Sequence, residues 1–372
     1  MKLRLGMLLF IIGFSGWSHQ VYNEQQQLNW RAHNGNAVAQ YRLGQEYWEN
    51  QSRTGAHYWW QRAAQQQFYP AIENLIHQFP ASHDDWLRLA AEAGDLSAQR
   101  EVATAELADE NISITQWQRR WADSNEPWLI RQQALLSRYQ RTKQCGMTIK
   151  VIAAGLGDKE RYLNFLDAVE SSPFDSGNWC ISWVQDSSLS CISRSERNRA
   201  SCESEKTFNK QVILADKGIA SATNDTLTLT SDSSKKVIQH ELGHWMGLAD
   251  EYEMSEPLAR EFCYGNYHHK SFNIVVTDTG RSYSAAQVEE IYKGLPGPWR
   301  KEIGSWQRIA TQKGQQWLLG SSGGAKVGLY KADTCNSISE RQAWRPVRTQ
   351  TAMEAHSTGL WPELYLKLIT NQ

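Results

Sequence analysis

The sequence lacks a surplus of either charge: its 372 residues carry 39 lysines and arginines against 40 aspartates and glutamates. Proteins that bind nucleic acids or anionic membranes through their overall charge need a basic surplus. The composition therefore predicts no nucleic-acid partner and no membrane-surface role. A hydrophobic fraction of 41% excludes a disordered chain, and the length is sufficient for two packed domains.

Long hydrophobic runs are also missing, apart from Leu5–Phe14, which is too short for an ordinary spanning helix. Basic residues precede this run, and the small residues Gly16 and Ser18 follow it, which is the pattern of a secretory signal peptide cleaved before His19. An uncleaved anchor is the alternative. No cysteine follows the run to accept a bacterial lipid. We therefore expect a signal peptide over 1–18 and an exported bacterial protein, periplasmic or secreted, with no other membrane contact.

Cysteine is absent from the first 144 residues, and no C-x-x-C pair occurs anywhere in the chain. The absence of such pairs argues against a cysteine metal site. An even set of six in an exported chain predicts up to three disulfides, although 15 pairings are compatible with the sequence. The six are Cys145, Cys180, Cys191, Cys202, Cys263 and Cys335. Their confinement to the C-terminal part places a domain boundary at about 142/143.

Residues 19–142 show alanines and tryptophans at helical spacing. Trp59, Ala63, Ala64 and Ala71 recur 27 residues later as Trp86, Ala90, Ala91 and Ala98, as small residues do where paired helices approach closely. The pattern resembles the Sel-like repeats, relatives of the tetratricopeptide repeats. This resemblance implies helix pairs that either bind a protein partner or only support the neighbouring domain. The second unit needs a shortened first helix, with Pro80 in the gap.

From residue 143 the pattern changes to α/β. Strand-like runs and one helical run alternate, and Asp225–Thr230 alternates strictly, which predicts a half-exposed edge strand. Gly155 and Gly157 form a lone Gly-x-Gly without the third glycine of a nucleotide loop. The expected strands cover 147–154, 178–184, 211–215 and 225–230, and the expected helix covers 159–169.

The strongest candidate for a functional site is the motif His240-Glu241-Leu242-Gly243-His244. It falls in an expected helix over 234–246, capped by Ser233 or Ser234. Two histidines four residues apart lie on one helix face, where both imidazoles can bind one Zn²⁺. Glu241 is then placed to take a proton from a water molecule at the metal. Surface histidines on an amphipathic helix are the alternative.

The residues around this motif predict its setting. Gly247 follows at the position where a left-handed residue ends a helix, and Asp250 can return as a third ligand. Ile238, Leu242 and Trp245 repeat on the opposite face and should be buried against the sheet. An open sheet edge beside such a helix would let an extended peptide pair its backbone with that edge.

The spacing His-Glu-x-x-His-x-x-Gly-x-x-Asp resembles the metzincin zinc peptidases, with aspartate in place of their third histidine. Leu248–Tyr252 and the Arg345-Pro346 pair before Met353 are similar to the bacterial IgA-peptidase family. The resemblance implies an α+β chain, with a helical repeat segment followed by a metzincin-like catalytic domain over 143–372. It also implies a mixed sheet with an active-site helix, and Met353 as the apolar Met-turn beneath the histidines.

The ligands and role implied are a Zn²⁺ ion bound by His240, His244 and Asp250, and Glu241 as catalytic base of an endopeptidase acting on proteins or peptides. Family members that carry one more glycine place the ligand differently, so Glu251 stays an alternative to Asp250. A catalytically silent exported adaptor, which binds through its repeats and a protease-like domain, is the other reading. The neighbouring His268-His269 pair is expected to be solvated surface.

Overall fold

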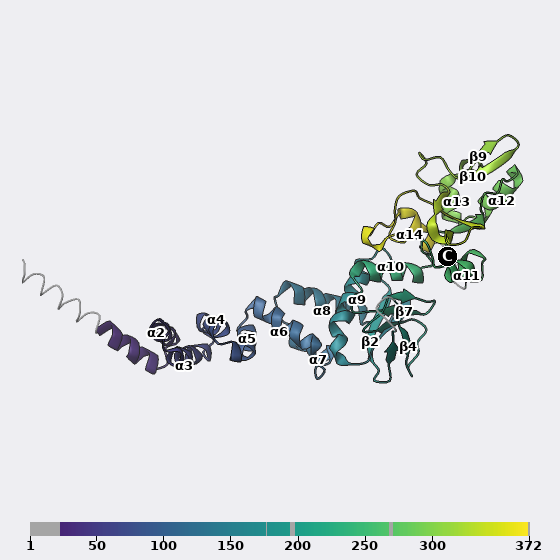
Figure 1. The fold of residues 1–372 in the computed structure, drawn as a ribbon. Helices are drawn as coiled ribbons and strands as arrows, with labels where there is room; N and C mark the ends of the chain where they lie inside the picture. The colour runs from purple at the N-terminus through teal and green to yellow at the C-terminus, as the bar shows by residue number, and fades with distance from the viewer. Residues whose placement is uncertain (1–22, 176, 194–197, 268–270, 371–372) are drawn as a thin grey trace, which may run out of the picture. The chain divides into compact units, whose positions relative to one another are not determined.

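The computed structural model describes residues 23–175, 177–193, 198–267 and 271–370. The expected signal peptide and the His268-His269 pair lie outside these residues. The chain divides into two compact units, Met1–Gln133 and Ala134–Gln372 (Figure 1). The first is helical and the second mixes helices with sheets, so the predicted α+β class is confirmed. The division falls earlier than the boundary expected from the cysteines.

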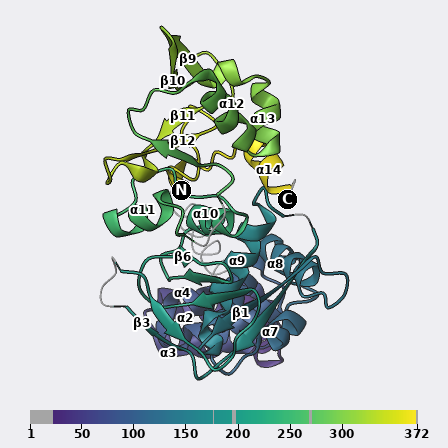
Figure 2. The same cartoon turned by 90° about the vertical axis from the view of Figure 1, so that its right-hand side faces the viewer.

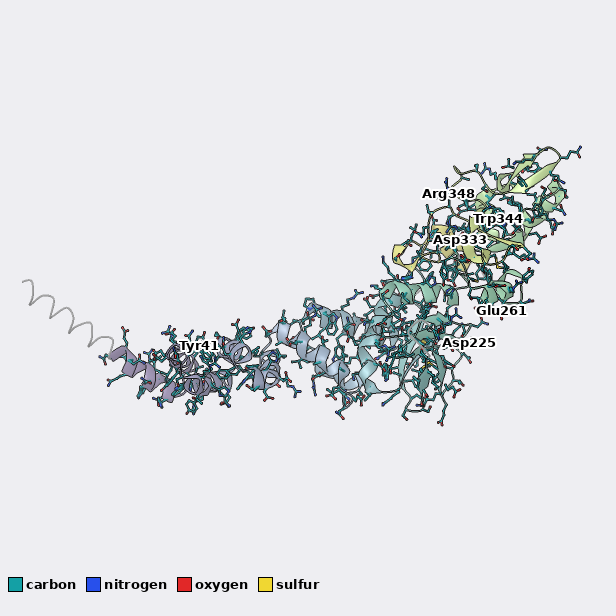
Figure 3. The ribbon with its side chains drawn as sticks, viewed as in Figure 1. Tyr41, Asp225, Glu261, Asp333, Trp344 and Arg348 are labelled. Atoms are coloured by element: carbon teal, nitrogen blue, oxygen red, sulfur yellow. A yellow bond between two sulfur atoms is a disulfide. The ribbon has the colours of Figure 1, made fainter. Side chains whose placement is uncertain are left out.

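The regular elements described in the first unit are all helices. Residues 23–33 are helical. They are followed by α2 (Ala37–Glu49), α3 (Arg53–Ala64), α4 (Tyr69–Gln78), α5 (His83–Glu92), α6 (Leu96–Ala108) and α7 (Ile114–Arg120), and α8 (Pro127–Tyr139) runs across the division. Aromatic side chains pack between neighbouring helices. The Trp60 indole of α3, for example, donates to the carbonyl of Tyr41 in α2 over 3.2 Å. Tyr41 is labelled among the side chains of these helices in Figure 3.

The recurring tryptophans and alanines at 59–71 and 86–98 are all buried, as their spacing predicts. Two of these helices also begin with the same kind of N-cap. Asn36 and Asp95 cap α2 and α6 by accepting from the backbone N–H three residues on, which satisfies an otherwise unpaired donor. The expected shortening is present: α4 has 10 residues against 13 in α2, and Pro80 opens the short turn that follows α4.

A five-stranded sheet forms the first half of the second unit, in the order β2-β1-β5-β7-β6. Four strands run parallel, and the last is antiparallel to β7. They are β1 (Met147–Ala153), β2 (Trp179–Gln185), β5 (Gln211–Leu214), β7 (Thr226–Leu229) and β6 (Ser221–Ala222). Branched apolar side chains of the central strands are fully buried, among them Ile149, Val151 and Val212, as is usual in parallel sheets covered by other elements.

The prediction that 225–230 is an edge strand is wrong. β7 pairs with β5 on one side and with β6 on the other, so it is internal. Thr228 and Thr230 are buried like the neighbouring leucines Leu227 and Leu229, because threonine is accommodated on either face of a strand. The edge beside the site belongs to β6, which is too short to leave a hydrophobic pattern in the sequence.

Two helices pack side by side along the sheet, α9 (Lys159–Glu170) and α10 (Lys235–Trp245) (Figure 2). Gln239 on α10 donates its side-chain amide to the carbonyl of Ala168 on α9 over 3.2 Å. Ile238, Leu242 and Trp245 are at most 9% exposed, so the predicted buried face of α10 is confirmed.

The rest of the second unit follows α10. It consists of a three-stranded antiparallel sheet, β11-β12-β8, a hairpin, β9–β10, and the helices α11 to α14 (Figure 2). The strands are β8 (Val275–Asp278), β9 (Ala310–Lys313), β10 (Gln316–Leu319), β11 (Tyr330–Ala332) and β12 (Arg341–Arg345). The helices are α11 (Glu256–Cys263), α12 (Ala285–Gly294), α13 (Gly297–Ile303) and α14 (Glu363–Thr370). Segments from this part return beneath α10.

All six cysteines are paired, in the bonds Cys145–Cys180, Cys191–Cys202 and Cys263–Cys335. The expected three disulfides are present, and such bonds persist in oxidising compartments. Cys191–Cys202 closes a small hairpin of β3 (Ser190–Ile192) and β4 (Ser201–Glu203). Within the described residues, no helix combines the length and the apolar character needed to cross a bilayer.

Candidate metal centre

Helix α10 carries the motif, and its two ends are defined by the residues the sequence singled out. Ser234 caps the start by accepting from the N–H of Val237. At the other end, Gly247 adopts a left-handed conformation with φ of +86°, and the N–H of Leu248 bonds to the carbonyl of Gly243 over 3.0 Å. This reversal ends the helix and turns the chain back past the histidines.

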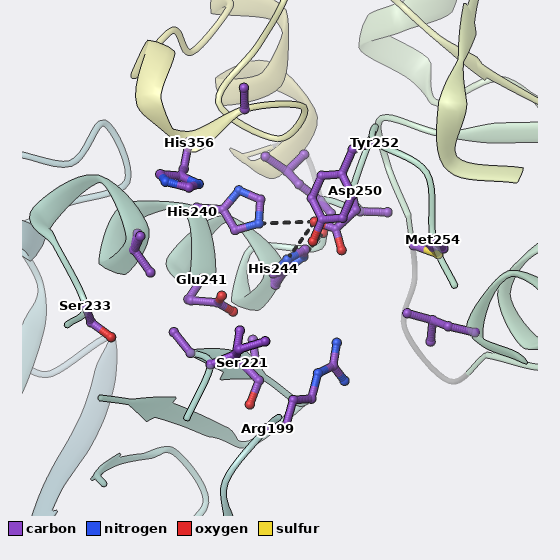
Figure 4. Close-up of a pocket in the computed structure, with 18 of the residues that line it drawn as sticks. Arg199, Ser221, Ser233, His240, Glu241, His244, Asp250, Tyr252, Met254 and His356 are labelled. Carbon is purple, nitrogen blue, oxygen red and sulfur yellow. Dashed lines mark hydrogen bonds and ion pairs between the residues drawn. The ribbon is translucent and has the colours of Figure 1, made fainter. Parts of the chain in front are cut away.

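The turn brings Asp250 to the two histidines. One carboxylate oxygen of Asp250, Oδ1, lies 3.1 Å from Nε2 of His240 and 3.2 Å from Nε2 of His244 (Figure 4). The three ligand atoms lie within 4.8 Å of one another. The three residues that the sequence proposes as ligands therefore converge on one point, at the wall of a cavity of about 620 Å³.

The outer nitrogens of both rings are held by backbone carbonyls. Nδ1 of His240 lies 2.8 Å from the carbonyl oxygen of Ala352, and Nδ1 of His244 lies 2.9 Å from that of Leu248. A carbonyl oxygen can only accept, so each Nδ1 carries a hydrogen and each ring turns its Nε2 toward Asp250. Such outer contacts orient metal-binding histidines.

When neither Nε2 carries a hydrogen, the two nitrogen lone pairs and the carboxylate oxygen repel one another unless a positive charge lies between them. Oδ1 of Asp250 is buried and has no hydrogen-bond partner of acceptable geometry in the described residues. A metal ion supplies the missing charge, and two imidazoles with one carboxylate are a ligand set typical of catalytic zinc. The donor set and the uncompensated oxygen therefore fit a divalent metal.

The short distances between these residues also shift the pKa values of His244 and Asp250. Burial acts to lower the pKa of His244, but the carboxylate of Asp250 outweighs it and raises that pKa to about 9. Burial opposes ionisation of Asp250, yet the two histidines hold the pKa of its carboxyl well below the usual range. In the absence of an ion the cluster would thus take up protons, which is the expected behaviour of a site that needs positive charge.

Glu241 lies on the cavity side of α10, between the histidines and β6 (Figure 4). Its side chain is buried, and one carboxylate oxygen, Oε2, has no hydrogen-bond partner among the described residues. Burial raises the pKa of Glu241, and the neighbouring His244 and His240 oppose this rise. A buried carboxyl with a raised pKa and an unused oxygen is suited to exchange a proton.

Glu251 is not part of the cluster. Its carboxylate is enclosed in the core and accepts from Asn273 over 2.9 Å, Arg345 over 3.1 Å and Thr351 over 2.8 Å, and also from the hydroxyl of Tyr365. The geometry therefore favours Asp250 over Glu251 as the third ligand. Glu251 instead ties the loop after α10 to the C-terminal segments.

Met353 lies directly beneath α10. Its side chain is fully buried, and its Sδ would be 2.8 Å from a Cβ placed on Gly243, the residue before His244. Its carbonyl accepts from the N–H of Glu251 over 3.0 Å. This is where an apolar floor for the two histidines would be placed, although its role at the site stays a prediction.

The cavity also contains residues that the motif analysis did not assign to the site. The ring of Tyr252 stacks on His240 with centroids 6.3 Å apart, and His356 approaches the same ring edge-on at 6.4 Å. Arg199 reaches the cavity from the β3–β4 hairpin side (Figure 4). Tyr252 stands within the motif itself, two residues after Asp250, but no pattern in the sequence marks His356 or Arg199.

No protein-family model matches the chain, and no curated protein matches it. The functional argument therefore depends on the convergence of His240, His244 and Asp250 and on the surroundings of Glu241.

Replacing Gly247 with alanine should destabilise the second unit and weaken metal binding. A Cβ at this position would lie 2.1 Å from the Phe272 ring. Gly265, which follows α11 with φ of +80° and open space around it, is the matched control. We expect about 1–2 kcal/mol for the left-handed backbone in Gly265→Ala, and about 1–3 kcal/mol more in Gly247→Ala. Denaturant unfolding and metal titration measure both effects, and equal losses would contradict this role of Gly247.

Proposed function

We propose that this protein is an exported bacterial zinc endopeptidase that hydrolyses peptide bonds of protein substrates. The observation that carries the proposal is the convergence of His240 Nε2, His244 Nε2 and Asp250 Oδ1, with the glutamate of the same motif beside them. Three protein ligands leave a coordination position for water or substrate, as catalytic zinc sites do. A purely structural zinc site would use all four positions.

Two roles are assigned to residues of this chain: metal binding and proton transfer. His240, His244 and Asp250 would hold the metal, which when bound polarises a carbonyl group and lowers the pKa of water. Glu241 takes a proton from the attacking water and later delivers it to the leaving amine. Its burial and its unused Oε2 support this role, because a base must have a free oxygen within the cavity.

An extended peptide has a place to bind. Strand β6 (Ser221–Ala222) ends the five-stranded sheet, and both of its residues line the cavity across from α10. No described strand pairs with its outer edge, so its backbone groups can accept a substrate strand. A peptide bound along β6 would pass Glu241, which places its backbone carbonyls near the metal ligands.

The setting of the protein follows from the disulfides and the helical unit. Three disulfides are consistent with the periplasm or the medium as the site of action. The helical unit would recruit a partner or a substrate protein, as helix-pair repeats do. Exposed aromatic residues on that unit, among them Trp30 at 69% and Tyr58 at 50% exposure, support such a surface.

The proposal is tested by measuring zinc content and cleavage of an unfolded protein by the purified mature chain. Wild-type protein should hold one zinc ion and cleave, whereas His244→Ala and Asp250→Ala should lose both properties. His77→Ala, which removes an α4 histidine far along the chain from the motif, serves as the control for histidine loss. Glu251→Gln should retain zinc better than Asp250→Ala if Asp250 is the ligand.

Two outcomes would overturn the proposal. Wild-type protein that holds zinc but cleaves no unfolded substrate would favour the silent adaptor. Retained zinc in His244→Ala would remove the site itself.

A further inference from the structure

The cavity beside the proposed metal ligands has an uneven lining. One part is apolar, with side chains that include Leu248, Met254 and Phe262. The polar part contains four carboxylates besides histidines and hydroxyl groups: Asp232, Glu241, Asp250 and Glu354. Arg199 is the one lysine or arginine among the described residues that line it. A single fixed cation among carboxylates marks a specific point in the cavity where an anion can bind.

The backbone that carries Arg199 is held in place on several sides. Arg199 forms a parallel bridge with Ile219, whose N–H donates to the carbonyl of Asn198 over 3.0 Å. Gly218 allows this approach: a Cβ there would lie 2.8 Å from that carbonyl oxygen. The disulfide Cys191–Cys202 closes the same hairpin. These contacts fix the position of the Arg199 backbone, so its exposed side chain extends from a defined place beside the cavity.

The guanidinium of Arg199 has no partner in the part of the chain that the structure describes. It makes no hydrogen bond and no ion pair with any other described residue, in contrast to Arg345, whose guanidinium contacts Glu251 and Glu354. Its side chain enters the cavity from the same side as Ser221 (Figure 4).

We propose that Arg199 binds a carboxylate of the substrate next to the scissile bond and thereby makes the enzyme selective for acidic peptides. The inference rests on the proposed peptidase function. Ile219, the bridge partner of Arg199, lies two residues before β6, so a peptide paired with β6 would extend toward Arg199. The carboxylates a peptide offers are aspartate and glutamate side chains and its own C-terminus, and the guanidinium fork binds a carboxylate through two parallel hydrogen bonds.

The test uses quenched fluorescent peptides of one sequence, with glutamate or glutamine at each position around the cleaved bond. A second pair compares a free C-terminal carboxylate with a C-terminal amide. For wild type we expect kcat/KM to be about 10–100-fold higher for the better-placed carboxylate, the factor typical of a charged hydrogen bond. The position of the effect distinguishes an internal acidic side chain from the C-terminus.

Arg199→Gln should remove this preference, Arg199→Lys should keep part of it, and Arg199→Glu should reverse it in favour of lysine-containing peptides. Lys217→Gln is the control, because it removes a positive charge from the loop that carries Ile219, the bridge partner of Arg199, at an exposed residue that does not line the cavity. Equal glutamate-to-glutamine ratios in wild type and Arg199→Gln would overturn the assignment while leaving the peptidase function intact.

A binding measurement keeps the two proposals separate. Zinc-loaded Glu241→Gln protein, with and without Arg199→Gln, is titrated with the labelled peptides by fluorescence anisotropy. Tighter binding of the acidic peptide that depends on Arg199 supports the carboxylate site even if no peptide is cleaved. Binding without this dependence overturns it.

Discussion

Glu241→Gln is expected to retain one zinc ion per chain and the wild-type fold, and to hydrolyse peptides about 10²–10⁴-fold more slowly. Glutamine has the same shape as glutamate but cannot take a proton at the pH of the reaction. The side chain contributes no atom to the group formed by His240, His244 and Asp250. Zinc stoichiometry, circular dichroism and kcat/KM for one peptide measure the three properties.

Asp232→Asn is the control for this variant. It removes a carboxylate from the lining of the same cavity, at an exposed residue outside the ligand cluster. The control should keep activity within a few-fold of wild type. If Glu241→Gln retained wild-type activity, or lost its zinc, Glu241 would not be the base and the mechanism would have to be abandoned.

The sequence predicts the helix of the site well because its information is local. The buried face of α10, the serine cap and the glycine at its end depend on residues within one or two turns. The spacing of the two histidines follows directly from the helical repeat. The turn at Gly247 is local as well, so the sequence could also predict that Asp250 returns toward the histidines.

Contacts between distant segments were not predictable in the same way. Glu251 bonds to Asn273, Arg345 and Tyr365, which lie 22, 94 and 114 residues further along the chain. Any buried carboxylate must find donors, but the sequence does not say which. The extra glycine of some family members left Glu251 open as a ligand, and only the structure shows that it is surrounded by donors.

The errors at the sheet have a physical origin as well. Strand β6 has only two residues, Ser221–Ala222, neither of them strongly hydrophobic, so no alternation marks it. Without β6, the threonines of 225–230 looked like the solvent side of an edge. Arg199 escaped notice because its relation to the site depends on a bridge to Ile219, twenty residues later in the chain.

The second large effect is expected from Glu251→Ala, which should lower the free energy of unfolding of the second unit by about 3–5 kcal/mol, the usual result of removing one partner from a buried charge pair. The variant leaves Arg345 with Glu354 as its remaining carboxylate partner among the described residues, and it leaves the buried hydroxyls of Thr351 and Tyr365 without their acceptor. Denaturant unfolding with a chelator present measures this loss independently of metal.

Zinc affinity should fall in the same variant, although Glu251 is not a ligand. Its N–H bonds to the carbonyl of Met353, and the neighbouring Ala352 carbonyl orients the ring of His240. Loosening this junction therefore disturbs Asp250 on one side and His240 on the other. Glu253→Ala, an exposed glutamate two residues away, is the control and should change neither quantity. If the two variants unfolded at the same denaturant concentration and bound zinc equally, the buried carboxylate would not be what holds the ligand loop in place.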